Sequence, residues 1–503
     1  MNRKIVSAFV VVVFILFGLF VLVGSLTSQN NTLAAAYKYI PVIAVLLGAL
    51  RPKAGLFLIL FLGAYSDKFS NMIYLTGKVF YFDDKLLKIS APMCVLGALG
   101  YCVLTMIQRR GPEDGRYLKG LLFSIGVTAL LFLIGVLGAR GAGVIGALSF
   151  SLTYAPYGMV PFLILFLYKK PAELKSLFIF SILIFLIPCI VGVRQHFLGG
   201  FNEDEIAVAV LSGVSQFEAQ EIAPRAIGWF TQPGRLGVVS VIMIASCWML
   251  LLKGKTFQLG MASKVLVVFL LIVYILCLYS SGKRLAFVMA LMFFGGHFAF
   301  SGVIRSGILY LSAISMIFLL AVFEKEATDL LLAYQRTMFE SAKSDGSIGT
   351  VSYVARLGTY VARIKTFALL LEPESYTMFG KDREEMSAVE LNAHSLPVQI
   401  LLGRGVLLTL SVALGSLALL IKAHFVFSRA EMKQTIGYSC FVLVLVLLFG
   451  GVLGARYVSG FPVTFFVGLI VGIAMLEVRN NKQNTDEEPD PERNSLIAGG
   501  KGL

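Results

Sequence analysis

The segment that decides the fold is Lys264–Phe300, KVLVVFLLIVYILCLYSSGKRLAFVMALMFFGGHFAF. Two apolar runs, 264–279 and 285–300, are separated by the short polar turn Ser280-Ser-Gly-Lys-Arg284. Each run approaches the length that an α-helix needs to cross a hydrocarbon core of about 30 Å. Lipid offers no partner for open backbone groups, so such runs must be helical. The segment therefore predicts two membrane-spanning helices joined by a tight turn.

The whole chain repeats this pattern. Hydrophobic residues make up 57% of the sequence, charged residues only 14%, and the mean hydropathy is +0.84. These values lie outside the range of soluble globular proteins. The alternating ten-residue strands of an outer-membrane barrel are absent from the sequence. We predict an all-α fold, a polytopic transmembrane helical bundle of about 12–14 spans that occupies residues 1–479.

Fourteen apolar segments are the candidate spans, and the first, 5–24, is expected to be a retained helix because no small-residue cleavage site follows it. The third is too short to cross a bilayer, so it and the second form either two spans or a re-entrant pair. The segments lie near 5–24, 36–50, 54–65, 88–107, 120–138, 152–168, 174–193, 236–252, 264–279, 285–300, 307–322, 397–421, 436–453 and 461–477.

Basic residues in the short loops predict the orientation. Short cytoplasmic loops carry an excess of Lys and Arg. The clusters near Arg3, Arg51, Arg109, Lys169, Lys253 and Lys422 all fall on the side that holds the N-terminus. We therefore expect both termini in the cytoplasm, and we read the net charge of +14 as a topology signal with no nucleic-acid partner.

Three sizeable loops, 66–87, 194–235 and 323–396, are predicted on the opposite, extracytoplasmic side. The last is a large and partly helical interruption between late spans. A long ordered loop in a membrane protein usually serves recognition or chemistry. The polar tail 480–503 is predicted to be disordered in the cytoplasm.

The end of loop 194–235 carries Arg225 and Arg235 among prolines, glycines and aromatic residues. This composition predicts a fixed turn at the membrane interface. An aromatic belt with snorkelling arginines explains it as well.

The large loop contains a helical segment, 351–371, in which Arg356, Tyr360 and Arg363 share one face. No acidic residue lies between Gly346 and Leu371, so these guanidinium groups are available to an external anion such as a phosphate. An amphipathic helix lying in the interface is the alternative.

Two further candidates lie at helix ends. Lys283 and Arg284 occupy the turn between two spans, where charges face a cavity or snorkel to the interface. His394 lies just before the span 397–421, and a histidine of ordinary pKa can accept a proton near neutral pH. A structural histidine is the alternative.

The missing motifs exclude several kinds of cofactor. The sequence has no Asp-x-Asp pair, no phosphate-binding Gly-rich loop with Lys-Ser/Thr and no His-Glu-x-x-His pattern. The six cysteines all lie in apolar segments, so neither a disulfide framework nor a thiolate metal site is expected. We predict neither a metal nor another cofactor.

Four motifs resemble the bacterial O-antigen ligase and O-antigen polymerase family over residues 190–450. They are Arg225-x-x-Gly-x-Phe-x-x-Pro, the Ser-Gly-Lys-Arg284 turn, Arg356-x-x-x-Tyr360 and Ala-His394-Ser. The resemblance implies a metal-independent inverting glycosyltransferase in the bacterial inner membrane. Its donor would be an undecaprenyl-diphosphate-linked glycan, and its acceptor a glycan or lipid hydroxyl at the extracytoplasmic face.

The resemblance also implies roles for individual residues. Arg225, Arg284 and Arg356 would bind the diphosphate, and His394 would activate the acceptor. Arg363 and Lys283 are additional diphosphate candidates, and Arg235 and Tyr360 are secondary substrate candidates. We favour a polymerase of O-antigen or exopolysaccharide over a ligase, with other polysaccharide-assembly proteins as partners.

The competing hypothesis is a transporter or flippase of lipid-linked glycans. A transporter places its polar residues near mid-bilayer, often in repeated halves. The polar candidates here fall at the predicted outer rim, and the halves of the sequence do not repeat. The sequence therefore favours glycosyl transfer.

Overall fold

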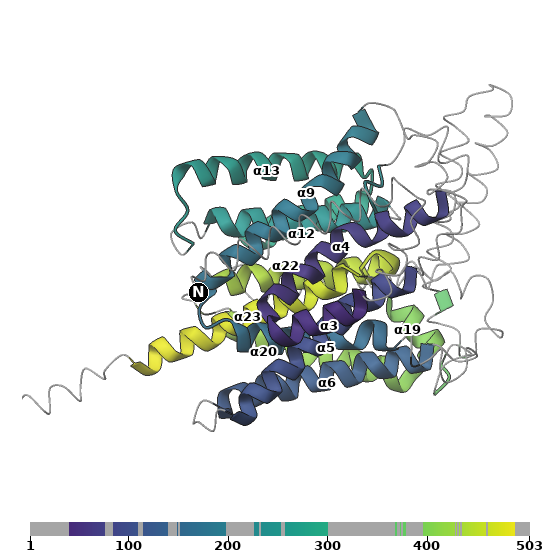
Figure 1. Cartoon of the computed structure of the whole chain (residues 1–503). Coiled ribbons are helices and arrows are strands. Elements are labelled where there is room, and N and C mark those ends of the chain that lie inside the picture. The colour runs from purple at the N-terminus through teal and green to yellow at the C-terminus, as the bar shows by residue number, and fades with distance from the viewer. Residues whose placement is uncertain are drawn as a thin grey trace, which may run out of the picture.

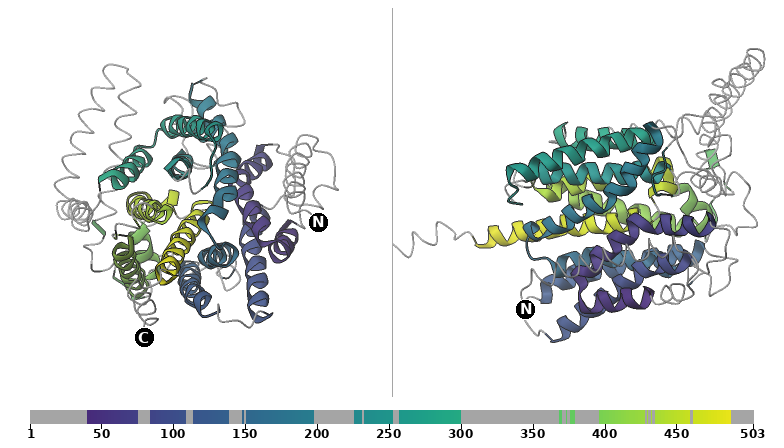
Figure 2. Two further views of the ribbon diagram at one scale, coloured as in Figure 1. Left: turned by 90° about the vertical axis from the view of Figure 1, so that its left-hand side faces the viewer. Right: turned by 45° about the horizontal axis from the view of Figure 1, so that its top comes forward.

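A computed structural model describes the architecture of this chain (Figure 1). The described residues are 40–75, 84–108, 114–138, 148, 151–197, 226–230, 233–252, 257–299, 368–369, 373, 376–378, 396–427, 429, 432, 435–458 and 461–487. In them, helices run roughly side by side as a bundle (Figure 2).

Long helices account for almost all of the described chain. In order they are α3 (Ile40–Leu50), α4 (Pro52–Leu75), α5 (Asp84–Gln108), α6 (Asp114–Gly138), α8 (Val160–Leu167), α9 (Lys175–Phe197), α12 (Pro233–Leu252), α13 (Met261–Ser280), α14 (Arg284–Ala299), α19 (Leu396–Arg404), α20 (Val406–Phe427), α22 (Ile436–Val458) and α23 (Val463–Glu487). Two short 3-10 turns, η1 (Ala155–Met159) and η2 (Pro171–Leu174), flank α8.

The predicted fold class is confirmed. The described ranges contain no β-strand, and seven of their helices are long and apolar enough to cross a membrane. Five shorter apolar helices accompany them. The chain is therefore an all-α polytopic membrane protein.

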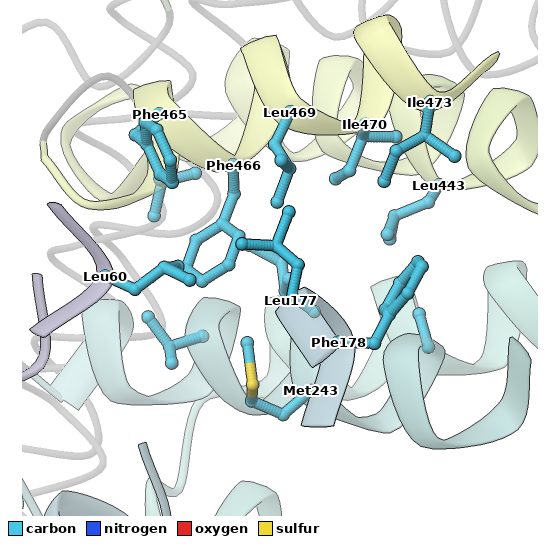
Figure 3. Close-up of a cluster of buried hydrophobic side chains, with 14 of the residues drawn as sticks. Leu60, Leu177, Phe178, Met243, Leu443, Phe465, Phe466, Leu469, Ile470 and Ile473 are labelled. Atoms are coloured by element: carbon cyan, nitrogen blue, oxygen red, sulfur yellow. The ribbon is translucent and has the colours of Figure 1, made fainter. Parts of the chain in front are cut away.

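The helix α12 lies at the centre of the bundle. It packs against α9, α13, α14, α22 and α23, and 78% of its membrane-length window is buried. Figure 3 shows part of this core, in which Met243 of α12, Leu177 of α9 and Leu443 of α22 face Phe466 and Ile473 of α23. The helices that carry the candidate site are thus fixed to a common apolar core.

Several loops predicted on one side of the membrane meet at one end of the bundle. Lys53 pairs with Glu173 at 3.4 Å between Nζ and Oε2, and its ammonium group lies 4.6 Å from the centre of the Tyr168 ring. Lys175 donates to the Gln258 carbonyl oxygen across 3.3 Å. The loops that follow α3, α8 and α12 therefore share an end, while the compartment that this end faces stays a prediction.

The guanidinium group of Arg479 fastens α23 to the same end. It donates hydrogen bonds to the carbonyl oxygens of Leu165, Tyr168 and Lys169 at 2.8, 3.0 and 3.1 Å. These carbonyls end α8, where a helix has no intrahelical donors left. Arg479 thus caps α8 with a side chain from α23.

Helix ends differ from the predicted spans in three places. The short segment 54–65 lies within α4, a helix of 24 residues that continues to Leu75 through part of the loop predicted at 66–87. Similarly, α23 runs to Glu487, past the start of the tail predicted at 480–503.

The third difference is a break in the predicted span 397–421. Gly405 has a φ of +85°, which separates α19 from α20. The Val406 N–H donates to the Thr377 carbonyl oxygen (2.9 Å), and Arg404 Nε donates to the Ile134 carbonyl oxygen (3.0 Å). Glycine reaches this conformation without a steric penalty. The helix therefore breaks at Gly405, although the sequence stays apolar on both sides of the break.

Candidate functional site

Two turns, Ala226–Phe230 and Ser280–Lys283, lie against each other at the end of the bundle opposite Arg479. The Ala226 N–H donates to the Ser280 carbonyl oxygen across 3.1 Å. Both turns belong to motifs singled out in the sequence, because Ala226 directly follows Arg225 and the second turn ends at Arg284. A backbone hydrogen bond therefore joins the segments of two distant motifs.

The Ala226–Phe230 turn depends on Gly228. Its φ is +59°, a left-handed conformation that glycine adopts at little cost, and the Phe230 N–H closes the turn on the Ile227 carbonyl oxygen at 3.0 Å. A Cβ added at Gly228 would collide with the carbonyl oxygen of Pro188 in α9. The turn thus lies directly on the backbone of α9.

The side chain of Gln195 in α9 holds this turn. Gln195 is fully buried, and its Oε1 accepts the N–H groups of Ile227 and Gly228 at 3.0 and 2.8 Å. Its Nε2 donates to the Gly228 carbonyl oxygen at 3.3 Å. Buried backbone polar groups need such partners, so Gln195 satisfies three that the turn leaves open.

Sequence reasoning missed Gln195. It lies outside every motif, at the edge of a predicted span, where a polar residue is unremarkable. The signal that could have found it is an amide at the end of a span, between Arg194 and His196, since polar groups at membrane depth need a specific partner.

The Ser280–Lys283 turn links α13 to α14 through its own hydrogen bonds. The N–H groups of Ser281 and Gly282 donate to the carbonyl oxygens of Cys277 and Tyr279, both at 3.0 Å, and Gly282 has a φ of +59°. The Ser281 hydroxyl donates to the Leu278 carbonyl oxygen at 2.7 Å and accepts the Lys283 N–H at 3.4 Å. Local polar groups therefore fix the direction in which α14 leaves the turn.

The first turns of α12 pack on this second turn at Gly237. A Cβ added at Gly237 would lie 2.8 Å from the Cβ of Ala286 and 3.7 Å from the Cβ of Lys283. Arg235 precedes Gly237 by two residues in the same helix. Both Arg235 and Lys283 are half-buried and both engage partners. Lys283 therefore lies where α12 meets the turn between α13 and α14, whereas Arg235, two residues before Gly237, lies on a different face of α12.

Aromatic side chains surround the paired turns. The His196 ring lies edge-on to Tyr279 with centroids 5.3 Å apart, and Phe197 stacks on Tyr279 at 6.5 Å. In the first turn, the ring centroid of Trp229 lies 5.1 Å from that of Tyr65 in α4. The fold thus places His196, which lies outside the sequence motifs, beside the second turn.

The remaining predicted residues lie outside the described parts of the chain. They are Arg225, Arg356, Tyr360, Arg363 and His394. Arg284 is the first residue of α14, and its side chain is likewise outside the description. Convergence of these side chains stays a prediction.

The helices that adjoin two of these residues have a common neighbour. α14, which begins at Arg284, and α19, which begins two residues after His394, both pack against α22. The contact of α14 with α22 is close: a Cβ at Gly450 would lie 2.6 Å from the Sδ of Met289. Both helices therefore share α22 as a neighbour.

The described residues gather no group of three His, Cys, Asp or Glu side chains that could hold a metal ion. The chemistry that this junction offers is basic and aromatic, with glycine turns fixed by buried hydrogen bonds. Such a surface suits an anionic group attached to a larger apolar or sugar moiety.

No protein-family model, curated protein or solved structure matches this chain significantly.

Proposed function

We propose that this protein is a membrane glycosyltransferase of surface polysaccharide assembly. It transfers or polymerises glycan from an undecaprenyl-diphosphate-linked donor onto an acceptor hydroxyl. The observation that supports the proposal best is the Ala226–Ser280 hydrogen bond. It joins the segments next to Arg225 and Arg284, two of the three arginines for which the family resemblance implies a role in binding the diphosphate.

In this proposal the site lies at the extracytoplasmic face of the bacterial inner membrane. Arg225, Arg284 and Arg356 bind the diphosphate, with Lys283 and Arg363 adding positive charge. Arginine suits this task because its planar fork donates two parallel hydrogen bonds to phosphate oxygens. Arg235 and Tyr360 contact the substrate more peripherally.

The reaction is a single displacement at the anomeric carbon. The acceptor oxygen forms a bond to that carbon while the bond from the carbon to the diphosphate oxygen breaks, and the hydroxyl proton passes to His394. Negative charge develops on the leaving diphosphate, where the cationic side chains stabilise it in the transition state.

The buried scaffold supports this mechanism through preorganisation. Fixed donors stabilise developing charge better than mobile ones because they need no reorganisation during the reaction. The Gln195 side chain bonds the backbone of the first turn, and the Ser281 hydroxyl bonds the second turn to the end of α13. Backbone that is fixed in this way keeps the attached basic residues in a constant relative position.

The test is transfer by purified protein in lipid nanodiscs supplied with an undecaprenyl-diphosphate glycan. We expect His394→Ala to reduce the rate about 10²–10⁴-fold and Arg284→Ala to abolish transfer. Lys170→Ala, an exposed residue at the other end of the bundle, is the control and keeps the wild-type rate. The glycan length of the product separates polymerase from ligase.

Wild-type rates in both site variants would contradict the proposed site. Relocation of the donor between leaflets of a sealed vesicle, without any new glycosidic bond, would instead establish the transporter hypothesis.

A further inference from the structure

We propose that Gln195 is a positioning residue of the donor site, a role that rests on the proposed function. Gln195 fixes the Ala226–Phe230 turn against the Ser280–Lys283 turn, so that the diphosphate meets a preformed pair of turns. Gln195 itself binds no substrate, because its amide is fully buried and engaged with backbone atoms.

The hydrogen bonds of Gln195 all converge on one peptide region. Its Oε1 lies 3.0 Å from the Ile227 nitrogen and 2.8 Å from the Gly228 nitrogen, and its Nε2 lies 3.3 Å from the Gly228 oxygen. These bonds fix the orientation of the peptide groups on both sides of Ile227–Gly228. The side chain therefore sets the direction of the turn as well as satisfying its polar atoms.

The turn is held from two directions. Gln195 attaches it to α9, and the Ala226 N–H attaches it to Ser280 at the end of α13. Glycine at position 228 has the widest conformational freedom of any residue, so the turn would not keep one shape unaided. Without Gln195, the Ala226–Ser280 hydrogen bond would remain to join the backbone of the turn to α13.

A purely structural role is the alternative to a positioning role. In that case loss of Gln195 would lower the thermal stability, and the folded fraction would still bind the diphosphate normally. In a positioning role, folded protein itself binds the diphosphate less tightly. Binding measured well below the unfolding midpoint separates the two.

The chain contains a reporter at the right place. It has two tryptophans, Trp229 within the turn and Trp248 in α12 against Phe294. A Trp248→Phe background leaves Trp229 as the sole tryptophan. Its fluorescence and its acrylamide quenching then report on the turn, where the indole lies against Tyr65.

The experiment measures binding of undecaprenyl diphosphate to this background protein in nanodiscs. Gln195→Met keeps the side-chain length and removes every hydrogen bond, and we expect it to raise the Kd at least about tenfold and to increase quenching of Trp229. Gln195→Glu keeps the acceptor oxygen for both N–H groups but loses the donor to the Gly228 oxygen and adds a buried negative charge, so we expect its Kd to rise as well.

Ser181→Ala is the matched control. Ser181 is a buried polar residue of the same helix whose hydroxyl bonds only the Leu177 carbonyl oxygen (2.8 Å). Its loss should leave Kd and Trp229 quenching unchanged. If Gln195→Met is not recovered folded, Gln195→Asn, which is one methylene too short to reach the turn, takes its place.

A Kd for Gln195→Met equal to that of the background protein would overturn the positioning role, whatever the change in stability. Equal losses in Gln195→Met and Ser181→Ala would overturn it as well. Failure of the background protein itself to bind the diphosphate or to transfer glycan would refute the proposed function, and the role of Gln195 would fall with it.

Discussion

Gly192 of α9 and Gly228 lie close together, with the Leu236 side chain packed beside both. A Cβ built on Gly192 would lie 2.9 Å from Leu236 Cδ2 and 3.6 Å from both the Cα and the nitrogen of Gly228. One glycine lies in a helix and the other in a left-handed turn, and the missing side chains leave room for this approach. This contact brings the turn close enough for Gln195 to reach it.

Gly228→Ala should destabilise the protein and displace the turn. The left-handed conformation costs an L-residue about 1–2 kcal/mol, and the new methyl group would also meet the Pro188 carbonyl oxygen. We expect a lower unfolding midpoint and a changed Trp229 emission. Gly126→Ala in α6, where a Cβ meets nothing within 4 Å, is the control and should be neutral or stabilising. Equal midpoints for the two variants would contradict this account.

Tyr274→Phe should cost about 1–2 kcal/mol of stability. The Tyr274 hydroxyl donates to the Ile182 carbonyl oxygen, and both residues are buried between α13 and α9. Denaturant titration in detergent, followed by circular dichroism, measures the loss. Tyr101→Phe, on a partly exposed face of α5, is expected to change stability little. A neutral Tyr274→Phe would mean that this hydrogen bond contributes nothing to the packing of the two helices.

Arg479→Lys should loosen α23 from α8. The guanidinium group donates to three carbonyl oxygens at once. The ammonium group of lysine is a compact point charge on a flexible stem and cannot match the planar fork of donors in arginine. We expect a loss of about 1–2 kcal/mol in the free energy of unfolding. Faster hydrogen exchange of the Leu165–Lys169 amides would locate the effect. Unchanged exchange there would show that the cap is dispensable.

Thiol labelling tests the predicted orientation. All six native cysteines are free and buried, so they form a silent background for a membrane-impermeant maleimide. Lys170, just before η2, and Phe197, the last residue of α9, are exposed and lie beyond opposite ends of the span that α9 forms. In intact cells stripped of the outer membrane, Phe197→Cys should be labelled, and Lys170→Cys should react only after permeabilisation. The reverse pattern would invert the proposed location of the site.

The fold class could be predicted from the sequence because a bilayer imposes one requirement on every span, an apolar helix of sufficient length. The arrangement of the spans could not. α12 and α20 have the same mean hydropathy of 2.1, yet 78% of the α12 window is buried and only 6% of the α20 window. Lipid and protein interior are equally apolar, so hydropathy does not tell a central helix from a peripheral one.

The charged residues of the candidate site could be predicted from the sequence, but the uncharged residues that support them could not. Charged residues such as Lys283 stand out against an apolar sequence, and the structure places Lys283 where α12 meets the turn between α13 and α14. The Gln195 side chain bonds the Ala226–Phe230 turn, and the missing side chain of Gly237 leaves space for the Ser280–Lys283 turn. Both roles depend on which segments lie opposite these residues, and local composition does not contain that information.

The enclosure of α12 has a consequence for biogenesis. Its final neighbours, α22 and α23, are synthesised last, so α12 must enter the bilayer while one flank still borders lipid. Ser240 and Ser246 bond back to their own helix, at Leu236 and Ile242, and this self-sufficiency lets the segment tolerate that interval. Nascent chains that end before α22 would therefore hold the central helix with the flank that α22 and α23 later cover still open.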